Sequence, residues 1–424
     1  MPAILDGAIR RAVVISNGFA GAENQCIGLV RALGFSNCHT IYRVTRPRGG
    51  INRWLQWLPV SVHKKLESVV RMSCGKSSLR TPHTIGLSNV LEADAYHLAT
   101  TARETFHKGG PLLVVASGRD TISVASSIKR LAPENVFLVQ IQHPRFHLNR
   151  FDLVITPRHD YYPQTPHAQQ QIPRFLRRWV TPWEPPGRNV VLTVGALHQA
   201  DSAALRVAAS AWHKELGTLP KPLLVVNVGG PTGNCPYGVD FVKKLVVMLQ
   251  SVLWSCGSIK ISFSRRTPDK ISKILVKEFS TNPKVQIWDG EGPNPHMGHL
   301  AWADAFVITA DSVSMLSEAC STGKPVYVVG AELCTWKFAD FQNSLQKHGV
   351  ARPFTGKENV SCHLKHKGDP ISLTLNHPEK DPAIGPIPKV EITESWSYPP
   401  LNDTAEASRQ VIAALAQRGW TIHP

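Results

Sequence analysis

The sequence predicts an α/β protein with two Rossmann-like, doubly wound domains. One observation is that short apolar runs rich in β-branched residues recur along the chain, as expected of parallel strands buried on both faces. Another is that these runs end in glycine or polar turns that lead into helices. Residues 307–329 show this pattern without a gap, as strand, polar turn, helix, glycine stop and strand. The length of 424 residues is sufficient for two such domains, each with its own core.

The first block of strands begins near the N-terminus. Residues 13–25 read as a strand, a glycine turn and the start of a helix, and residues 112–120 repeat this order. Residues 136–144 and 153–157 add two further buried strands with polar residues at their ends. We therefore expect an N-terminal Rossmann-like domain over residues 1–185.

A proline-rich bridge separates this block from the second one. The prolines between about residues 157 and 188 exclude long regular elements and indicate a linker. A new strand pattern starts at residue 189, so we expect the second domain to span residues 186–424. Within it, a stretch at about 357–400, rich in Pro, His and Lys, reads as a surface insertion before a closing helix at 404–417.

Charge is the most unusual bulk property of the chain. The 47 Lys and Arg residues exceed the 31 Asp and Glu residues, which gives a net charge of +16 and a sequence pI of about 9.6. Such a surface attracts lipid head groups, nucleotide phosphates or acidic proteins. The basic residues form only short groups, with no zinc-finger or RNA-binding signature, so nucleic acid is not an expected partner.

Membrane-spanning and metal-binding segments are not expected. No apolar run approaches the ~20 residues that span a bilayer, and the N-terminal apolar stretch is too short for a signal peptide, which favours a cytosolic start. The eight cysteines include no Cys-x-x-Cys pair and fit reduced thiols. Cys362, His363 and His366 could be read as metal ligands, but one loop without a second cluster is better explained as solvated surface.

The second domain carries polar residues or glycines after several predicted strands. In an open α/β sheet, ligands bind beyond the carboxyl ends of the strands. A helix N-terminus offers amide donors to phosphate oxygens, and a carboxylate further along can accept from sugar hydroxyls. The alternative is that the serines only cap helices, the glycines only turn the chain and the arginines only solvate a loop. The ligand-binding residues predicted on one rim are Gly229, Gly230, Ser264, Arg265, Arg266, Thr267, Ser312, Ser314 and Glu318.

One spacing points to a class of ligand. The pattern Asp-Ser-x-Ser-x-x-x-Glu-Ala-x-x-x-Gly-Lys-Pro at residues 311–325 resembles the nucleotide-sugar half-site of the GT-B glycosyltransferases. The resemblance implies two domains that face a cleft, with a nucleotide sugar as ligand.

Sugar transfer would also need a general base from the N-terminal domain. Glu23, Asp120 and His143 are the candidates, because each lies near a predicted strand end. None stands in a spacing that proves this role. Glu23 can instead complement a helix dipole, Asp120 can cap a helix and His143 can hold a turn.

Five stretches are specific enough to indicate a family. They are Gly-Phe-Ala-Gly-Ala-Glu-Asn-Gln at residues 18–25, Tyr-Arg-Val-Thr-Arg-Pro-Arg-Gly-Gly-Ile-Asn at 42–52, Ser-Arg-Arg-Thr-Pro at 264–268, Leu-Ala-Trp-Ala-Asp at 300–304 and Thr-Ala-Asp-Ser-Val-Ser-Met at 309–315. Together they resemble the plant mitochondrial fission factors of the elongated-mitochondria family, which has bacterial relatives. The resemblance implies a peripheral protein on the cytosolic face of the mitochondrial outer membrane that helps to localise a dynamin-related GTPase to division sites.

Two functions of different classes therefore compete. An enzyme needs the rim and a base, whereas an adaptor needs only the scaffold and an adhesive surface. Tryptophans at three-residue spacing beside basic residues form one candidate surface, although they are also typical of a helix's core face. That patch consists of Trp54, Trp57 and Leu58 with Arg53, Lys64 and Lys65.

We expect the adaptor. It would be a mitochondrial fission factor that contacts the GTPase and the membrane surface, located on the mitochondrial outer membrane and in the cytosol. A glycosyltransferase is the alternative, and no cofactor is expected other than a nucleotide sugar in a retained pocket.

Overall fold

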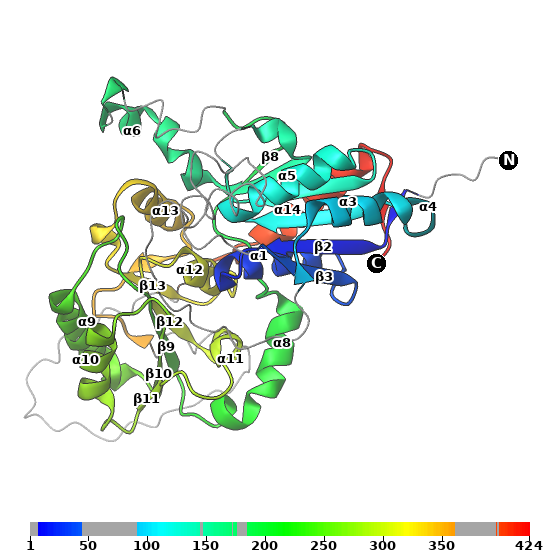
Figure 1. Ribbon diagram of the computed structural model, residues 1–424. Helices are drawn as coiled ribbons and strands as arrows, with labels where there is room; N and C mark the ends of the chain where they lie inside the picture. Colours follow the sequence, from blue (N-terminus) through cyan, green and yellow to red (C-terminus); the bar gives the residue numbers. More distant parts are fainter. Residues whose placement is uncertain are drawn as a thin grey trace, which may run out of the picture. The chain divides into compact units, whose positions relative to one another are not determined.

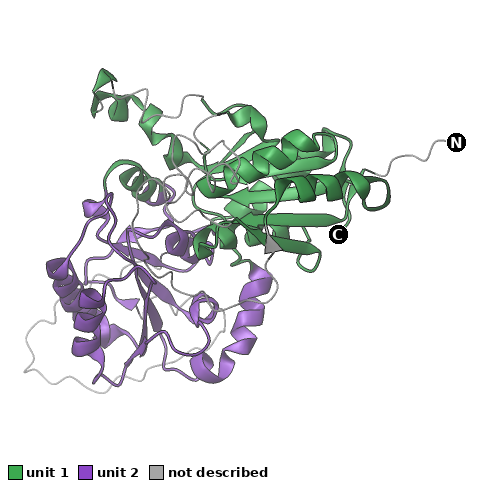
Figure 2. Ribbon diagram, viewed as in Figure 1, with its two compact units in different colours: residues 1–201, 335–344, 401–424 green, residues 202–334, 345–400 purple. Residues whose placement is uncertain are grey.

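The computed structural model of the protein describes residues 7–44, 91–144, 147–171, 173–175, 185–360, 396 and 398–424. The chain forms two compact units, each with a parallel sheet between layers of helices (Figures 1 and 2). Unit 1 comprises Met1–Asp201, Thr335–Ser344 and Leu401–Pro424, and unit 2 comprises Ser202–Cys334 and Leu345–Pro400. The predicted fold class, with two Rossmann-like doubly wound domains, is confirmed. The predicted cleft between them stays a prediction.

The main sheet of unit 1 has seven parallel strands in the order β4-β3-β2-β5-β6-β7-β8. β2 lies between β3 and β5, so the chain winds outwards from it in both directions, as in doubly wound folds. The strands are β2 (Arg11–Ser16), β3 (His39–Arg43), β4 (Leu91–Glu92), β5 (Leu112–Ser117), β6 (Val136–Ile141), β7 (Leu153–Pro157) and β8 (Val190–Thr193). A separate pair joins β1 (Ala8–Ile9) to β15 (Thr421–Ile422).

Helices cover both faces of this sheet. One buried cluster joins one face to α1 and α14, and a second joins the other face to α3 and α5. Neighbouring residues of one strand enter different clusters, as Leu113 and Val114 of β5 do, which explains the unbroken apolar runs. The helices are α1 (Ala20–Ala32), α3 (Ala95–Glu104), α4 (Phe106–Gly109), α5 (Ile122–Leu131), α6 (Pro166–Gln171) and α14 (Asp403–Ala416).

The sheet of unit 2 repeats the winding with six parallel strands in the order β11-β10-β9-β12-β13-β14. Its central strand, β9, lies between β10 and β12. The strands are β9 (Leu223–Val228), β10 (Ser258–Phe263), β11 (Val285–Trp288), β12 (Ala305–Thr309), β13 (Val326–Val329) and β14 (Arg352–Pro353).

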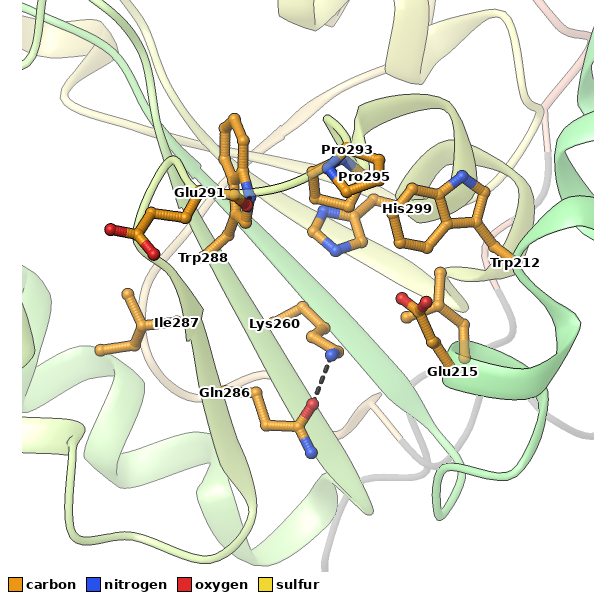
Figure 3. A pocket seen from close by; sticks show the side chains of 11 residues that line it. Trp212, Glu215, Lys260, Gln286, Ile287, Trp288, Glu291, Pro293, Pro295 and His299 are labelled. Atoms are coloured by element: carbon orange, nitrogen blue, oxygen red, sulfur yellow. Dashed lines mark hydrogen bonds between the residues drawn. The ribbon is translucent and has the colours of Figure 1, made fainter.

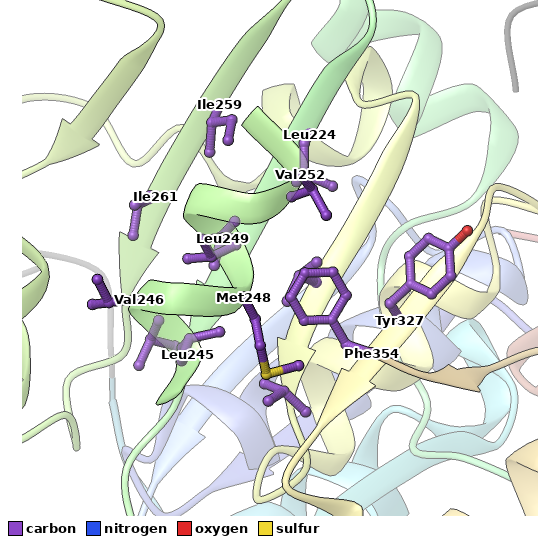
Figure 4. Packing of buried hydrophobic residues seen from close by; sticks show 14 of the residues in the cluster. Leu224, Leu245, Val246, Met248, Leu249, Val252, Ile259, Ile261, Tyr327 and Phe354 are labelled. Carbon is purple, nitrogen blue, oxygen red and sulfur yellow. The ribbon is translucent and has the colours of Figure 1, made fainter. Parts of the chain in front are cut away.

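The largest apolar cluster of unit 2 lies between this sheet and α9. Leu245 and Leu249 of α9 point at Ile259 and Ile261 of β10, and Phe354 packs beside them (Figure 4). α9 and α10 lie side by side, with α8 and α11 on the opposite side of the sheet (Figure 1). The helices of this unit are α8 (Ser202–Ala211), α9 (Val239–Val252), α10 (Asp269–Phe279), α11 (His296–Trp302) and α12 (Val313–Cys320). Most of α13 (Trp336–Lys347) belongs to unit 1, and its last residues belong to unit 2.

The division of the chain differs from the expected boundary at residues 185 and 186. β8, which was expected to open the second domain, instead pairs with β7 in the sheet of unit 1, from Val154 opposite Val190 to Pro157 opposite Thr193. The physical reason is that Val190 and Val191 of β8 pack against the two apolar clusters on either face of this sheet. The chain therefore enters unit 2 only after Asp201.

The closing helix also belongs to unit 1 and not to the second domain. Asp403, at the start of α14, accepts hydrogen bonds from the N–H groups of Val194 (2.9 Å) and Gly195 (2.7 Å). Val411 and Leu415 are buried in the cluster that includes α1. α14 therefore covers an apolar face that the N-terminal strands and α1 leave incomplete. Most of the predicted insertion at 357–400 lies outside the described residues.

The burial of α14 leads to a prediction about stability. Leu415 is 1% exposed, whereas Ile412 on the same helix is 48% exposed. We expect Leu415→Ala to lower the free energy of unfolding by about 2–5 kcal/mol, because it leaves a cavity in the core of unit 1. The matched change Ile412→Ala should cost less than about 0.5 kcal/mol. Urea denaturation monitored by circular dichroism measures both, and equal losses would contradict the assignment of α14 to this core.

Candidate functional site

The predicted rim lies at the point in unit 2 where the winding reverses. β9 and β12 are neighbours in the sheet, although three α-helices and two strands separate them in sequence. Gly229 and Gly230 follow β9, and Ser312 follows β12, so the structure brings these residues to one place. Doubly wound sheets bind ligands at this position.

Asp311 organises the rim. Its buried carboxylate accepts hydrogen bonds from the Gly230 N–H (2.9 Å), the Thr309 hydroxyl (2.7 Å) and the Tyr237 hydroxyl (3.2 Å). The Arg266 guanidinium lies 3.1 Å from Oδ2. Burial raises the pKa of Asp311, while these donors oppose the rise. The carboxylate thus ties together three segments that follow different strands.

The two glycines fit closely around this carboxylate. The Gly229 N–H donates to Thr309 Oγ1 (2.7 Å), and the Gly230 N–H donates to Asp311. A Cβ atom on Gly229 would lie 2.2 Å from Asp311 Oδ2, and one on Gly230 would lie 2.2 Å from the Arg266 carbonyl oxygen. The chain's own groups therefore require glycine here. Both amides are engaged within the protein, so phosphate binding at these positions would have to displace existing bonds.

The loop after β10 is also held internally. The Thr267 hydroxyl lies 2.9 Å from the Val228 carbonyl oxygen and 2.7 Å from that of Gly229. Ser264 Oγ accepts the Arg266 N–H at 3.2 Å, and Arg265 is exposed on the same loop. This loop therefore holds the backbone at the glycine pair in place through hydrogen bonds, while Arg265 faces solvent.

On α12, the predicted residues have different roles. Ser312 caps the helix and accepts the Met315 N–H at 3.4 Å, which is the alternative role considered for the serines, and Ser314 is half-buried in the first turn. Glu318 is buried, and its Oε2 lies 2.6 Å from His296 Nε2 on α11. The carboxylate expected to accept from a sugar hydroxyl thus already has a histidine partner.

The surroundings of two histidines of α11 shift their pKa values in opposite directions. Burial lowers the pKa of His296, but the charge and hydrogen bond of Glu318 outweigh it and raise that pKa above its ordinary value. Burial lowers the pKa of His299 to about 3, with help from Lys260 and His296. His299 Nδ1 lies 3.2 Å from Ser262 Oγ. The helix therefore carries one histidine that favours the charged form and one that stays neutral.

A pocket of about 240 Å³ lies beside α11, over β10 and β11 (Figure 3). The Lys260 amino group points into its centre and bonds Gln286 Oε1, with tryptophan and proline rings around it. None of the predicted ligand-binding residues lines it. The lining residues are Trp212, Glu215, Leu216, Lys260, Gln286, Ile287, Trp288, Glu291, Pro293, Pro295 and His299.

Two of the base candidates lie where the winding of unit 1 reverses, after β2 and β5. Glu23 Oε2 accepts from the Ser16 hydroxyl (2.6 Å), and Arg43 Nη2 pairs with Oε1 (3.1 Å). Asp120 Oδ2 accepts from Asn17 Nδ2 (3.2 Å). These carboxylates bind groups of the protein itself, as expected for structural ion pairs and hydrogen bonds.

His143, the third candidate, follows β6, which lies beyond β5 in the sheet. Its buried ring meets the ring of Tyr161 edge to face, with 4.8 Å between centroids. A general-base role for any of the three residues stays a prediction.

Several sequence predictions lie outside the described residues. These include the candidate patch around Trp54, Trp57, Leu58, Arg53, Lys64 and Lys65, and the group Cys362, His363 and His366. Within the described ranges, no group of three His, Cys, Asp or Glu residues is placed to hold a metal ion. None of the described helices is both long and apolar enough to cross a membrane.

Sequence reasoning missed the roles of Asp311, Tyr237 and His296. Asp311 was not among the predicted ligand-binding residues, although its position shortly after a buried strand was a signal. Tyr237 and His296 carry no such signal, because their partners are 74 and 22 residues away.

Comparison with known proteins identifies the family to which the chain belongs. The family model described as Mitochondrial fission ELM1 matches residues 20–415. Mitochondrial fission protein ELM1 of Arabidopsis thaliana is 57% identical over 429 residues, covering 98% of this chain and 93% of that protein. The chain belongs to the Mitochondrial fission ELM1 family. An uncharacterised protein of Rickettsia prowazekii (strain Madrid E) shares 31% identity with this member of the ELM1 family over 62% of the chain and 76% of its own length.

Solved structures of low sequence identity also align with this ELM1-family chain. The UDP-GlcNAc 2-epimerase of Methanocaldococcus jannaschii is 12% identical, with a TM-score of 0.47, over 96% of this chain and 99% of that one. The UDP-GlcNAc 2-epimerase of Neisseria meningitidis, solved with UDP-GlcNAc, is 12% identical, with a TM-score of 0.45, over the same shares. Similarity at this level carries no information about ligand or reaction.

The glycine pair leads to a second prediction. Gly229→Ala should lower the free energy of unfolding by about 1–3 kcal/mol, because its Cβ would collide with the Asp311 carboxylate. Gly233 lies on the same loop with nothing within 4 Å of its added Cβ, so Gly233→Ala is the matched control and should change stability by less than about 0.5 kcal/mol. Chemical denaturation measures both changes. A Gly229→Ala variant as stable as the control would show that the rim is open enough to accept a side chain.

The two histidines of α11 give a third prediction. His296 has a raised pKa, so its contribution to stability is present below its unfolded value of 6.5 and is lost as pH rises through the folded pKa. His299 has a pKa of about 3, so its contribution is present above 6.5 and is lost as pH falls towards 3. His296→Gln should therefore lower the free energy of unfolding more at about pH 6 than at about pH 9. His299→Gln should reduce the loss of unfolding free energy that occurs as the pH falls below 6.5.

Urea denaturation at a series of pH values measures how the free energy of unfolding of each variant depends on pH, and the two dependences should be opposite. Each variant is the control for the other, because both replace a histidine of the same helix with the same amide. Identical pH dependence in the two variants would contradict the proposed environments.

Proposed function

We propose that the protein is a peripheral fission factor on the cytosolic face of the mitochondrial outer membrane, where it helps to localise a dynamin-related GTPase. The observation that carries the proposal is the 57% identity to the Arabidopsis protein named for mitochondrial fission, over nearly the whole of both chains. An adaptor of this kind needs one surface for the membrane and one for its partner, and no catalytic group.

Charge supports membrane contact through one face of unit 2. The chain carries a net charge of +16, and the neighbouring helices α9 and α10 both carry exposed lysines. Trp254, directly after α9, is 68% exposed. Lysines favour anionic lipid, and an exposed tryptophan suits the head-group region. The α9–α10 lysine face consists of Lys243, Lys244, Lys270, Lys273 and Lys277.

The polar network at the rim of unit 2 favours an adaptor over a glycosyltransferase. Asp311, Thr309 and His296 occupy the amides and the carboxylate that a nucleotide sugar would use. In unit 1, Glu23 and Asp120 are likewise engaged. The position of the rim at the point where the winding reverses remains the argument for the alternative, a nucleotide-sugar transferase.

Complementation of cells that lack the endogenous protein tests the proposal. The triple variant Lys243→Glu, Lys273→Glu and Lys277→Glu should leave a larger share of the protein in the cytosol and produce longer mitochondria, because reversed charge repels anionic lipid. The matched control reverses three exposed lysines outside this face, Lys108, Lys214 and Lys347, and should divide normally. Mitochondrial length and the fraction of protein that sediments with mitochondria are the measurements.

A second variant in the same cells separates the two functions. Glu23→Gln, Asp120→Asn and His143→Gln together remove the proton-transfer capacity of every base candidate with side chains of similar size. Normal mitochondrial length with this folded variant supports the adaptor. Elongated mitochondria with a folded and correctly located protein, alongside normal division in the lysine variant, would overturn the proposal in favour of the enzyme.

A further inference from the structure

Two buried cysteines of unit 2 meet beside the rim. The Sγ atoms of Cys235 and Cys334 are 2.8 Å apart, and neither is in a disulfide. A disulfide holds its sulfurs ~2.05 Å apart, so bond formation requires a movement of less than about 1 Å. No Cys-x-x-Cys motif marks the pair, because 99 positions separate the two residues in sequence.

The local structure holds both cysteines in this arrangement. Cys235 closes a tight turn in which it exchanges two backbone hydrogen bonds of 3.1 Å with Thr232. Cys334 follows the 3₁₀ turn Ala331–Leu333, after β13. The Gly330 carbonyl oxygen lies 3.9 Å from one sulfur and 3.8 Å from the other. The sulfurs therefore bridge the loop after β9 and the loop after β13.

We propose that Cys235 and Cys334 are a redox-modification site that forms a reversible disulfide on exposure to hydrogen peroxide. The Cys334 sulfur displaces water from the peroxide, which gives a sulfenic acid and one water molecule. The Cys235 thiol then attacks that sulfur, the S–S bond forms, and the hydroxyl group leaves with the thiol proton as a second water molecule. The peroxide is reduced by two electrons, and the two thiols supply them.

The environments of the two thiols assign the order of these steps. Cys334 is 8% exposed and Cys235 is 1% exposed, so peroxide reaches Cys334 first. The hydrogen bond with Cys334 and burial raise the pKa of Cys235, which keeps it a thiol until its neighbour is oxidised. Reaction is then intramolecular and needs no large rearrangement.

The disulfide would act on the rim and on the stability of unit 2. The loop of Cys235 also carries Tyr237, whose hydroxyl donates to Asp311 at 3.2 Å. Oxidation would therefore fix the position of a residue that contacts the central carboxylate. The crosslink would close a loop that contains four of the six strands of the sheet, from β10 to β13, and would restrict the unfolded chain.

Peptide mapping of the full-length protein tests the proposal. The folded protein is treated with hydrogen peroxide, then unfolded in denaturant, alkylated with N-ethylmaleimide and digested without reductant. We expect a crosslinked peptide pair that contains Cys235 and Cys334 and that dithiothreitol abolishes. We also expect the midpoint of thermal unfolding to rise by several degrees on oxidation and to return on reduction.

Matched cysteine variants complete the experiment. Cys334→Ser and Cys235→Ser should each abolish the crosslink and the rise in the midpoint. Cys256→Ser should retain both, because Cys256 is buried elsewhere in unit 2, where burial raises its pKa to about 11. If either serine variant fails to fold, the map of the wild-type protein decides alone. Full alkylation of both cysteines after peroxide treatment, or a crosslink to another cysteine, would overturn the proposal.

Discussion

The buried carboxylate of Asp311 is the constraint from which the rim of unit 2 follows. A buried charge without partners is strongly destabilising, so its oxygens must receive donors from every side. One donor is a backbone amide and two are hydroxyls, while Arg266 supplies the opposing charge. This arrangement leaves no space for a side chain at Gly229, and it fixes the path of the chain after β9. The glycine pair is therefore explained by the protein's own electrostatics, without reference to a ligand.

The strands could be predicted from sequence because burial on both faces leaves an unbroken apolar run that needs no knowledge of neighbours. The convergence of Gly229 and Ser312 could also be predicted, because the winding rule places the ends of the first and fourth strands together. The addition of β8 to the sheet of unit 1 and the packing of α14 against the same unit could not be predicted from sequence. Each depends on pairing between distant segments, such as Asp403 with Val194, 209 positions apart.

The same limit applies to the candidate site. The capping role of Ser312 could be considered from sequence because capping depends only on residues three positions away. The pairing of Glu318 with His296 depends on how α11 lies against α12, which a local pattern does not record. The pocket around Lys260 is similar, since its wall includes Trp212 from outside the sheet. The place where the rim residues converge could thus be predicted from sequence. The hydrogen bonds and ion pairs among them became visible only in the three-dimensional structure.

Unit 1 is assembled from three separate parts of the chain, and the last of them is Leu401–Pro424. A ribosome synthesises α14 and β15 only after all of unit 2, so the N-terminal strands wait for their covering helix throughout translation. Domains generally fold as they are synthesised, in order from the N-terminus. Here the inserted unit can finish first, and the N-terminal part of unit 1 keeps an apolar face uncovered until α14 has been synthesised. Premature termination near the C-terminus would therefore damage the part of the protein that was made earliest.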